Sequence, residues 1–318
     1  MRSLIGFLGF LSRQARWALP AGVFVGIALP ALASLLRPLL TAAVIGTLTG
    51  ALLRLDWRRF ADLGRRPGLP AGLALWLLVV SPLIVWFGTA LAGLPPDLRL
   101  VLLLQAAAPP IGSAAVFALI LGLDGVLAAL ATVAATLLLP LTLTPLVVLL
   151  LPEAGVRVDL LPFFVRVTLL VIVPFLFAWI LRRAIGLARL RRSDALLGGS
   201  NVLLLVVFAI AVMDGVTARL LSEPGLIGLL LLTSFVAAVL LHLSGYLLFR
   251  RTGTTSAYTA AVLSGNRNLG LMLVITAGTA GEMFSLYVGV AQIPMYFAPL
   301  LLTPLLRWSR AQARVGRA

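Results

Sequence analysis

One arginine, Arg267, lies in the middle of an otherwise apolar run, where its positive charge could bind an anion or replace a cation. If the run crosses a bilayer, an arginine at its centre costs at least about 3 kcal/mol and needs compensation. Three interpretations are open. The guanidinium could bind a carboxylate, sulfate or phosphate of a substrate, or act as a tethered cation in place of a coupling ion, or be satisfied by carbonyls of a broken helix. Charges inside membranes are usually functional, which favours the first two.

Helix-breaking residues surround Arg267 and recur in an earlier apolar run. Ser264-Gly265-Asn266-Arg267-Asn268 interrupts the later run, and Pro109-Pro110-Ile111-Gly112-Ser113 interrupts the earlier one. The two prolines remove N–H donors, so we expect the carbonyls of Gln105 and Ala106 to be free for a cation or for substrate hydroxyls. The half-helix beyond a break begins with unpaired N–H groups, which suit an anion. The predicted substrate or ion site comprises Pro109, Pro110, Gly112, Ser113, Thr132, Ser264, Gly265, Asn266, Arg267 and Asn268.

Other polar residues in apolar runs have two interpretations each. Thr132 and Thr136 lie one turn apart and could face the broken helices, or their hydroxyls could bond back to their own helix. Asp214 could offset Arg267 or carry a proton, or it could pair with Arg219.

Composition excludes several kinds of site. His242 is the only histidine, so a histidine relay or a multi-histidine metal site is excluded, and we expect His242 to be a packing residue. With no cysteine there is no disulfide and no thiolate metal site. We therefore expect no metal and no cofactor.

The elements that must position these residues are membrane-spanning helices. Hydrophobic residues make up 61% of the 318-residue chain and charged residues 11%, against about 45–50% and 25% in soluble domains. A span needs about 20 apolar residues, and helices satisfy their own backbone in hydrocarbon. Ten such runs are predicted, at residues 19–36, 39–55, 69–91, 99–121, 126–151, 161–181, 198–220, 224–249, 256–278 and 283–308.

Arginines set the predicted topology. The chain has 25 basic residues and no lysine, and they cluster between apolar runs, which excludes a nucleic-acid-binding face. Nineteen fall on the side of the two termini, so we expect a multi-pass protein of the cell (inner) membrane with both termini cytoplasmic. Residues 1–18 are predicted as a cytoplasmic amphipathic lead-in and residues 309–318 as a basic cytoplasmic tail. The opposite side receives Arg37, Arg99, Arg157, Arg166 and Arg219.

A sequence repeat divides the chain in two. Pro140-Leu141-Thr142-Leu143-Thr144-Pro145 recurs 159 residues later as Pro299-Leu300-Leu301-Leu302-Thr303-Pro304, matching at five of six positions. A shift of 158 residues superimposes Gly112 on Gly270, within the two interrupted runs. A unit with five crossings must insert its second copy upside down. The predicted fold is all-α, with inverted five-helix repeats at residues 19–159 and 160–308 and discontinuous, crossing fourth and ninth helices.

These segments resemble the bile acid:sodium symporter family, within the superfamily that also holds arsenite and auxin efflux carriers. The segment Gly265-Asn266-Arg267-Asn268-Leu269-Gly270-Leu271 is similar to the family's Gly-x-Gln-Asn-x-Gly-Leu run. The stretch from Pro109 through Gly112 and Ser113 to Thr132, Pro140, Thr144 and Pro145 is also similar. The resemblance implies a panel domain from spans one, two, six and seven, a core domain from the others, and substrate held between them near the crossing.

The chain departs from the family at the sodium ligands. The family uses a Ser-Asn pair in the fourth span, hydroxyls in the fifth, and a Glu and a Gln in the ninth. Here Ser113 is followed by alanine, Leu263 or Ser264 stands at the Glu position and Arg267 at the Gln position, while Thr132 and Asn268 match. A guanidinium there should repel sodium. We therefore expect a relative that does not use the usual sodium sites, with Arg267 standing in for the ion.

The leading functional prediction is a secondary active transporter of a small organic anion that works by alternating access. Its expected partners are an anionic small-molecule substrate and the lipid bilayer, with no nucleic acid; the coupling ion is left open. One alternative is a proton-coupled efflux carrier with Asp214 as the titrating group. The other is a membrane-embedded enzyme or sensor. An enzyme is disfavoured because no cluster of His, Asp, Glu or Cys at ligand spacing is found, and a sensor is disfavoured because the predicted spans leave no soluble output domain.

Overall fold

The computed structural model describes residues 2–55, 68–150 and 159–315, and within these ranges the chain is almost entirely helical, with no β-strand. Arg58, Arg59, Arg65, Arg66, Arg157 and Arg317, which contributed to the predicted topology, lie outside the described residues. The elements are α1 (Arg2–Arg13), α2 (Ala15–Ala28), α3 (Pro30–Leu36), η1 (Arg37–Leu39), α4 (Leu40–Leu53), α6 (Gly68–Leu75), the π turn η2 (Trp76–Val80), α7 (Ser81–Leu91), α8 (Pro96–Ala107), α9 (Ala114–Ile120), α10 (Gly125–Leu150), α11 (Leu160–Ile185), α12 (Leu187–Arg192), α13 (Asp194–Ala211), α14 (Val216–Ser222), α15 (Pro224–Phe249), η4 (Arg250–Thr252), α16 (Thr254–Gly265), α17 (Leu269–Ile275) and α18 (Gly281–Val315).

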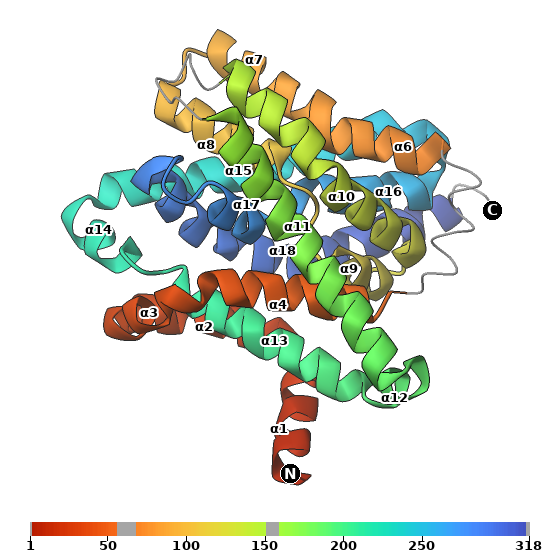
Figure 1. Ribbon diagram of the computed structural model, residues 1–318. Helices are drawn as coiled ribbons and strands as arrows, with labels where there is room; N and C mark the ends of the chain where they lie inside the picture. The colour runs from red at the N-terminus through yellow and green to blue at the C-terminus, as the bar shows by residue number, and fades with distance from the viewer. Residues whose placement is uncertain (1, 56–67, 151–158, 316–318) are drawn as a thin grey trace.

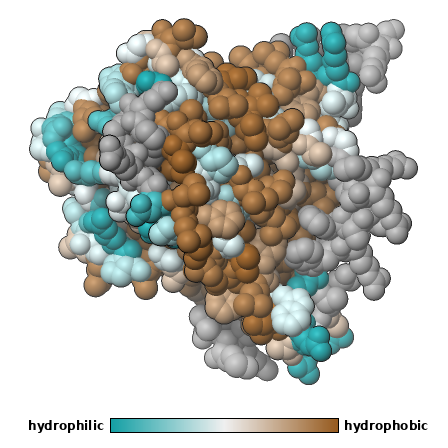
Figure 2. Space-filling view, turned by 45° about the horizontal axis from the view of Figure 1, so that its top comes forward, coloured by the Kyte–Doolittle hydropathy of each residue, from teal (hydrophilic) through white to brown (hydrophobic). Residues whose placement is uncertain are grey.

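Several helices have the length and apolar composition of membrane spans. In the described part of the chain, six helical stretches, some with a short irregular turn inside them, meet both conditions, at residues 30–53, 68–91, 125–150, 160–185, 194–222 and 224–252. The predicted fourth and ninth spans fall outside this set because each is broken into two shorter helices. Figure 2 shows a broad apolar surface with hydrophilic side chains gathered mainly at its margins. The described part of the chain is thus almost entirely helical, with the long apolar helices of a membrane protein.

The helices form two packing groups. In the first, which we call the panel group (α1 to α4 and α11 to α14), α13 packs against α1, α2 and α4, and α11 packs against α4. In the second, the core group (α6 to α10 and α15 to α18), α15 packs against α16 and α18, α7 against α8, and α10 against α6, α9 and α16. The groups touch at several places, among them where α17 meets α4, where α2 meets α18, where α14 meets α15, and where α11 runs obliquely over α10 (Figure 1).

Two predicted spans end differently from the expectation. The first is interrupted at Leu29, directly before Pro30, and becomes α2 and α3. The seventh ends at Ala211, and Gly215, with φ of 82°, turns the chain into α14. A positive φ is open to glycine at little cost, so the chain changes direction there. Asp214 consequently lies in a turn and not inside a helix.

Candidate functional site

Both predicted breaks are present, at equivalent places. The fourth run consists of α8, of 12 residues, and α9, of 7 residues, with an irregular segment from Ala108 to Ser113 between them. The ninth run repeats the pattern with α16, of 12 residues, and α17, of 7 residues, separated by Asn266, Arg267 and Asn268. The two broken runs therefore have half-helices of equal length.

The two irregular segments cross and pair through their backbones. The N–H of Ile111 donates to the carbonyl of Asn266 at 2.9 Å, and the N–H of Asn268 donates to the carbonyl of Pro109 at 2.7 Å. Pro110 and Arg267 therefore face each other as an isolated antiparallel bridge. Unpaired backbone groups are costly in a membrane interior, and this pairing satisfies four of them. We call this arrangement the crossing.

The side chain of Arg267 is enclosed beside the crossing, with 1% of the residue exposed. Its Nε donates to the carbonyl of Ser264 at 2.7 Å, and its Nη1 to the carbonyls of Leu77 at 3.0 Å and Ala108 at 2.9 Å. Its Nη2 donates to the hydroxyl of Ser81 at 3.2 Å. Hydrogen bonds to charged groups contribute about 1.5–3 kcal/mol each, so four of them offset an insertion cost of about 3 kcal/mol.

Two of these carbonyls are helix ends. Ala108 caps the C-terminus of α8, and Ser264 lies in the last turn of α16. Each helix C-terminus carries roughly half a negative charge. The two ends together present about one negative charge, which the single positive charge of the guanidinium balances. The expectation that Gln105 would supply a free carbonyl was wrong, because the Gln105 carbonyl accepts from the N–H of Ala108 at 3.2 Å. The expectation for Ala106 stays a prediction, and it is the carbonyl of Ala108 that contacts the guanidinium.

The third carbonyl, that of Leu77, is made available by an irregular helix. In the π turn η2, the N–H of Ser81 bonds to the carbonyl of Trp76 and so does not reach Leu77. The next residue is Pro82, which has no N–H to offer. The Leu77 carbonyl is thereby left for the guanidinium. Such π turns are frequent at functional sites.

The carboxylates that could have offset Arg267 lie elsewhere. Asp214 bonds to Arg37 at 2.6 Å, and neither of the two partners expected for it, Arg267 and Arg219, is seen. Arg219 instead bonds to Glu282 at 2.9 Å and to Glu223. The environment of Arg267 is therefore built from carbonyls and one hydroxyl among the described residues.

The two asparagines of the ninth run have separate contacts. The Asn268 side chain caps α17 by accepting from the N–H of Leu271 at 3.0 Å. The Asn266 amide donates to the Val262 carbonyl at 2.9 Å and lies 3.2 Å from His242 Nε2. His242 Nδ1 lies 2.7 Å from the carbonyl of Ala238, so both ring nitrogens have partners.

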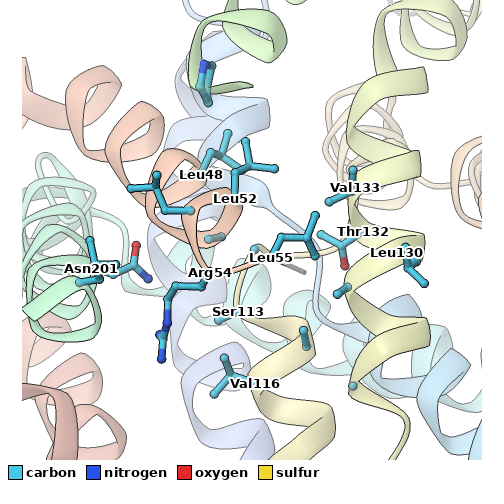
Figure 3. A pocket seen from close by; sticks show the side chains of 18 of the residues that line it. Leu48, Leu52, Arg54, Leu55, Ser113, Val116, Leu130, Thr132, Val133 and Asn201 are labelled. Carbon is cyan, nitrogen blue, oxygen red and sulfur yellow. The ribbon is translucent and has the colours of Figure 1, made fainter. Parts of the chain in front are cut away.

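A large cavity of about 950 Å³ lies between the panel group and the core group (Figure 3). Gly112 and Ser113 of the crossing line it, together with Thr132 and Thr136 of α10. The threonine hydroxyls bond to carbonyls of their own helix, at 2.8 Å and 2.7 Å. Figure 3 shows Asn201 of α13 on the opposite side from Thr132. The cavity thus separates the two packing groups next to the crossing.

Three charged side chains line the same cavity. Arg54 bonds to Asp194 with distances of 2.8 Å and 3.1 Å, and Arg182 donates to the carbonyl of Leu55 at 2.8 Å. The remaining lining residues are mainly leucine, valine and alanine. The described lining is therefore mainly apolar, with a polar region in which two arginines and one aspartate are present.

The structure brings together only part of the predicted site. Gly112, Ser113 and Thr132 line the large cavity, Asn268 lines a smaller adjoining one, and Arg267 lines neither of the two. Sequence reasoning did not find the contributions of Leu77 and Ser81 to the guanidinium, nor three further polar residues beside the crossing. Pro82, which directly follows Ser81, is a sequence signal that could have pointed to Leu77 and Ser81. The other three are Asn201, Gln292 and Tyr296.

Comparisons with models of protein families and with curated proteins find no match to this chain.

Proposed function

We propose that this protein is a secondary carrier of a small organic anion that works by alternating access, with Arg267 as a built-in cation at the crossing. It would be a relative of the bile acid:sodium symporters that lies in the cell membrane with both termini cytoplasmic and does not use the usual sodium sites. The observation that carries the proposal is the contact of one guanidinium with the C-terminal ends of two half-helices. The paired breaks and the adjoining cavity support it.

The setting of Arg267 is one that a monovalent cation would suit. Unwound carbonyls and half-helix C-termini are the groups that coordinate Na⁺ or H⁺ in carriers with broken helices. Here the Nε and Nη1 of Arg267 donate hydrogen bonds to the carbonyls of Ser264 and Ala108, respectively. A covalently attached charge cannot leave with the substrate, so transport would not draw on the sodium gradient at this place.

Contacts between the two packing groups support alternating access with one side closed. Arg166 of α11 donates to the carbonyls of Ala277 at 2.7 Å and Val274 at 3.0 Å, at the end of α17. Arg219 and Glu282 join α14 to α18 at 2.9 Å. These five residues lie at the side that the arginine distribution predicts to be external. The cavity, with Arg54 and Arg182, lies toward the predicted cytoplasmic side, as an inward-facing state requires.

The lining of the cavity favours an amphipathic anion. Its walls are mostly apolar, and its charged residues, Arg54, Arg182 and Asp194, give two positive charges against one negative. A planar or aliphatic body would lie against the walls, and a carboxylate, sulfonate or phosphate would be drawn to the positive region.

The proposal is tested by reconstituting the purified chain in proteoliposomes and screening uptake of aromatic and aliphatic carboxylates, sulfonates and phosphates. We expect saturable uptake of at least one class, unchanged when choline replaces sodium and strongly reduced in Arg267→Ala. Absence of saturable uptake across the screen would refute a carrier. Uptake that rises steeply with sodium would refute the role of Arg267.

A further inference from the structure

A second cavity, of about 40 Å³, adjoins the large one at the crossing. The two cavities share the lining residues Leu48, Gly112, Ser113 and Asn201, so the small one forms a side chamber of the large one. We call it the crossing chamber. Its other polar lining residues are Thr47, Asn268, Gln292 and Tyr296.

Three polar atoms of the crossing chamber's lining residues are buried without a hydrogen-bond partner. They are Asn201 Oδ1, Gln292 Oε1 and the hydroxyl of Tyr296, and the described part of the chain has only four other such side-chain atoms. Gln292 is 0% exposed and Tyr296 is 5% exposed. Buried polar groups are normally paired, and leaving three unpaired around one cavity destabilises the empty protein. A cluster of this kind therefore indicates a place where a ligand completes the hydrogen bonds.

The side chain of Gln292 already has one contact that orients it. Its Nε2 donates to the carbonyl of Val288, one turn earlier, at 2.9 Å, which leaves its oxygen as the free group. The amide oxygens of Gln292 and Asn201 can only accept hydrogen bonds, and the Tyr296 hydroxyl can accept or donate. The free atoms of the chamber would therefore be satisfied best by a group that donates hydrogen bonds.

The lack of charged side chains in the described lining of the chamber further limits which chemical groups could bind there. Among the described residues that line the crossing chamber, none is charged. A carboxylate or phosphate there would face acceptor oxygens, and an ammonium would be buried without a counter-charge; both are costly. An uncharged hydrogen-bond donor, such as a hydroxyl or a primary amide, avoids both of these costs.

We propose that the crossing chamber binds an uncharged, hydrogen-bond-donating group of the transported solute through Asn201, Gln292 and Tyr296. This inference rests on the proposed carrier function and adds a requirement to it. The solute carries its negative charge in the main cavity, near Arg54 and Arg182, and a hydroxyl or amide at its other end. Because Asn201 comes from the panel group and Gln292 from the core group, the bound group would contact both.

A matched set of three probes tests the requirement: naphthalene-2-carboxylate, its 6-hydroxy derivative and naphthalene-2,6-dicarboxylate. Binding to the full chain, purified in detergent, is measured by calorimetry. The 6-hydroxy compound should bind at least about tenfold more tightly than the parent acid, because only it supplies the missing donor. The dicarboxylate should bind no more tightly than the parent.

Two variants and a control assign the effect to the chamber. Tyr296→Phe and Gln292→Leu should each remove most of the preference for the hydroxyl while leaving the affinity for the parent acid within about twofold. Tyr287→Phe removes a hydroxyl from the same helix at a position that bonds to Gln105 and does not line the chamber, so the preference should persist.

The outcomes separate this inference from the carrier assignment. Equal affinity for the parent and the hydroxy compound, a hydroxyl preference that survives both variants, or binding of none of the three probes would overturn the chamber proposal. The carrier assignment fails only if the proteoliposome screen also finds no saturable uptake.

Discussion

The guanidinium of Arg267 lies 2.9 Å from the carbonyl oxygen of Ala108, so a side chain from the second broken helix closes the end of the first. The two residues are 159 positions apart in the chain. This contact and the backbone pairing of the crossing hold the same two segments together. The charge of Arg267 and the shape of the crossing are therefore parts of one arrangement.

Ser81 should contribute to this arrangement through its hydroxyl. Ser81→Ala leaves Nη2 of Arg267 without that acceptor, at a cost of about 1–3 kcal/mol. The apparent melting temperature of the purified protein should fall by several degrees. Ser244→Ala is the control, because that hydroxyl bonds only to the carbonyl of Leu241 in its own helix. Equal melting temperatures for the two variants would contradict the role given to Ser81.

Gly265 should tolerate no side chain while His242 is present. A Cβ at position 265 would lie 1.8 Å from the His242 ring, so Gly265→Ala forces the ring or the helix to move, and strain of this kind costs about 1–3 kcal/mol or more. Combining it with His242→Ala removes the obstacle. The double variant should be more stable than the sum of the two single changes predicts, by thermal unfolding. Additive effects would mean that the two residues are not in contact.

The large cavity should be reachable from one side of the membrane only. The chain has no cysteine, so a single introduced thiol reports its own position. Ala129→Cys lines the cavity and should react with a membrane-impermeant maleimide from the cytoplasmic face, in inside-out vesicles. Ala131→Cys on the same helix is 0% exposed and should stay unreactive from either face. Reaction of position 129 from the outer face alone would reverse the proposed orientation.

Arg166 should hold the outer side closed. Arg166→Ala removes two hydrogen bonds between α11 and the end of α17, so the outward-facing population should rise. In the Ala129→Cys background, the rate of labelling from the cytoplasmic face should then fall several-fold, because a shift of about 1.4 kcal/mol changes a population ratio tenfold. Arg183→Ala, on the same helix and stacked near Trp179, is the control. An unchanged rate would show that these bonds do not bias the equilibrium.

The broken helices could be predicted from sequence because their causes are local. Two adjacent prolines remove N–H donors, and the Gly265 to Asn268 segment combines glycine, asparagine and a buried charge. Each signal lies within a few residues of the break that it produces. The same applies to the asparagine at position 268, whose side chain caps the helix that follows it.

The partners of Arg267 could not be predicted because they depend on distant backbone. The Leu77 carbonyl lies 190 positions away and becomes available only through a π turn, whose local sign in the sequence is a single proline, Pro82. Asp214 was assigned to a helix interior, and the turn at Gly215 moved it to an ion pair with Arg37. In the sequence, Gln292 is one polar residue in a long apolar run. Its place in the crossing chamber depends on how α13 and α18 pack around that cavity, which the sequence does not show.

The sodium response of thermal stability, measured on the wild type and on Arg267→Ala, tests the central claim most directly. Removing the guanidinium loses four hydrogen bonds and leaves two helix ends uncompensated, so the variant should melt several degrees lower in choline chloride. Sodium or guanidinium ions at equal ionic strength should restore part of that loss by binding in the vacated place, while the wild type should not respond. A wild type that sodium stabilises as strongly as the variant, or a variant as stable as the wild type in choline, would contradict the account.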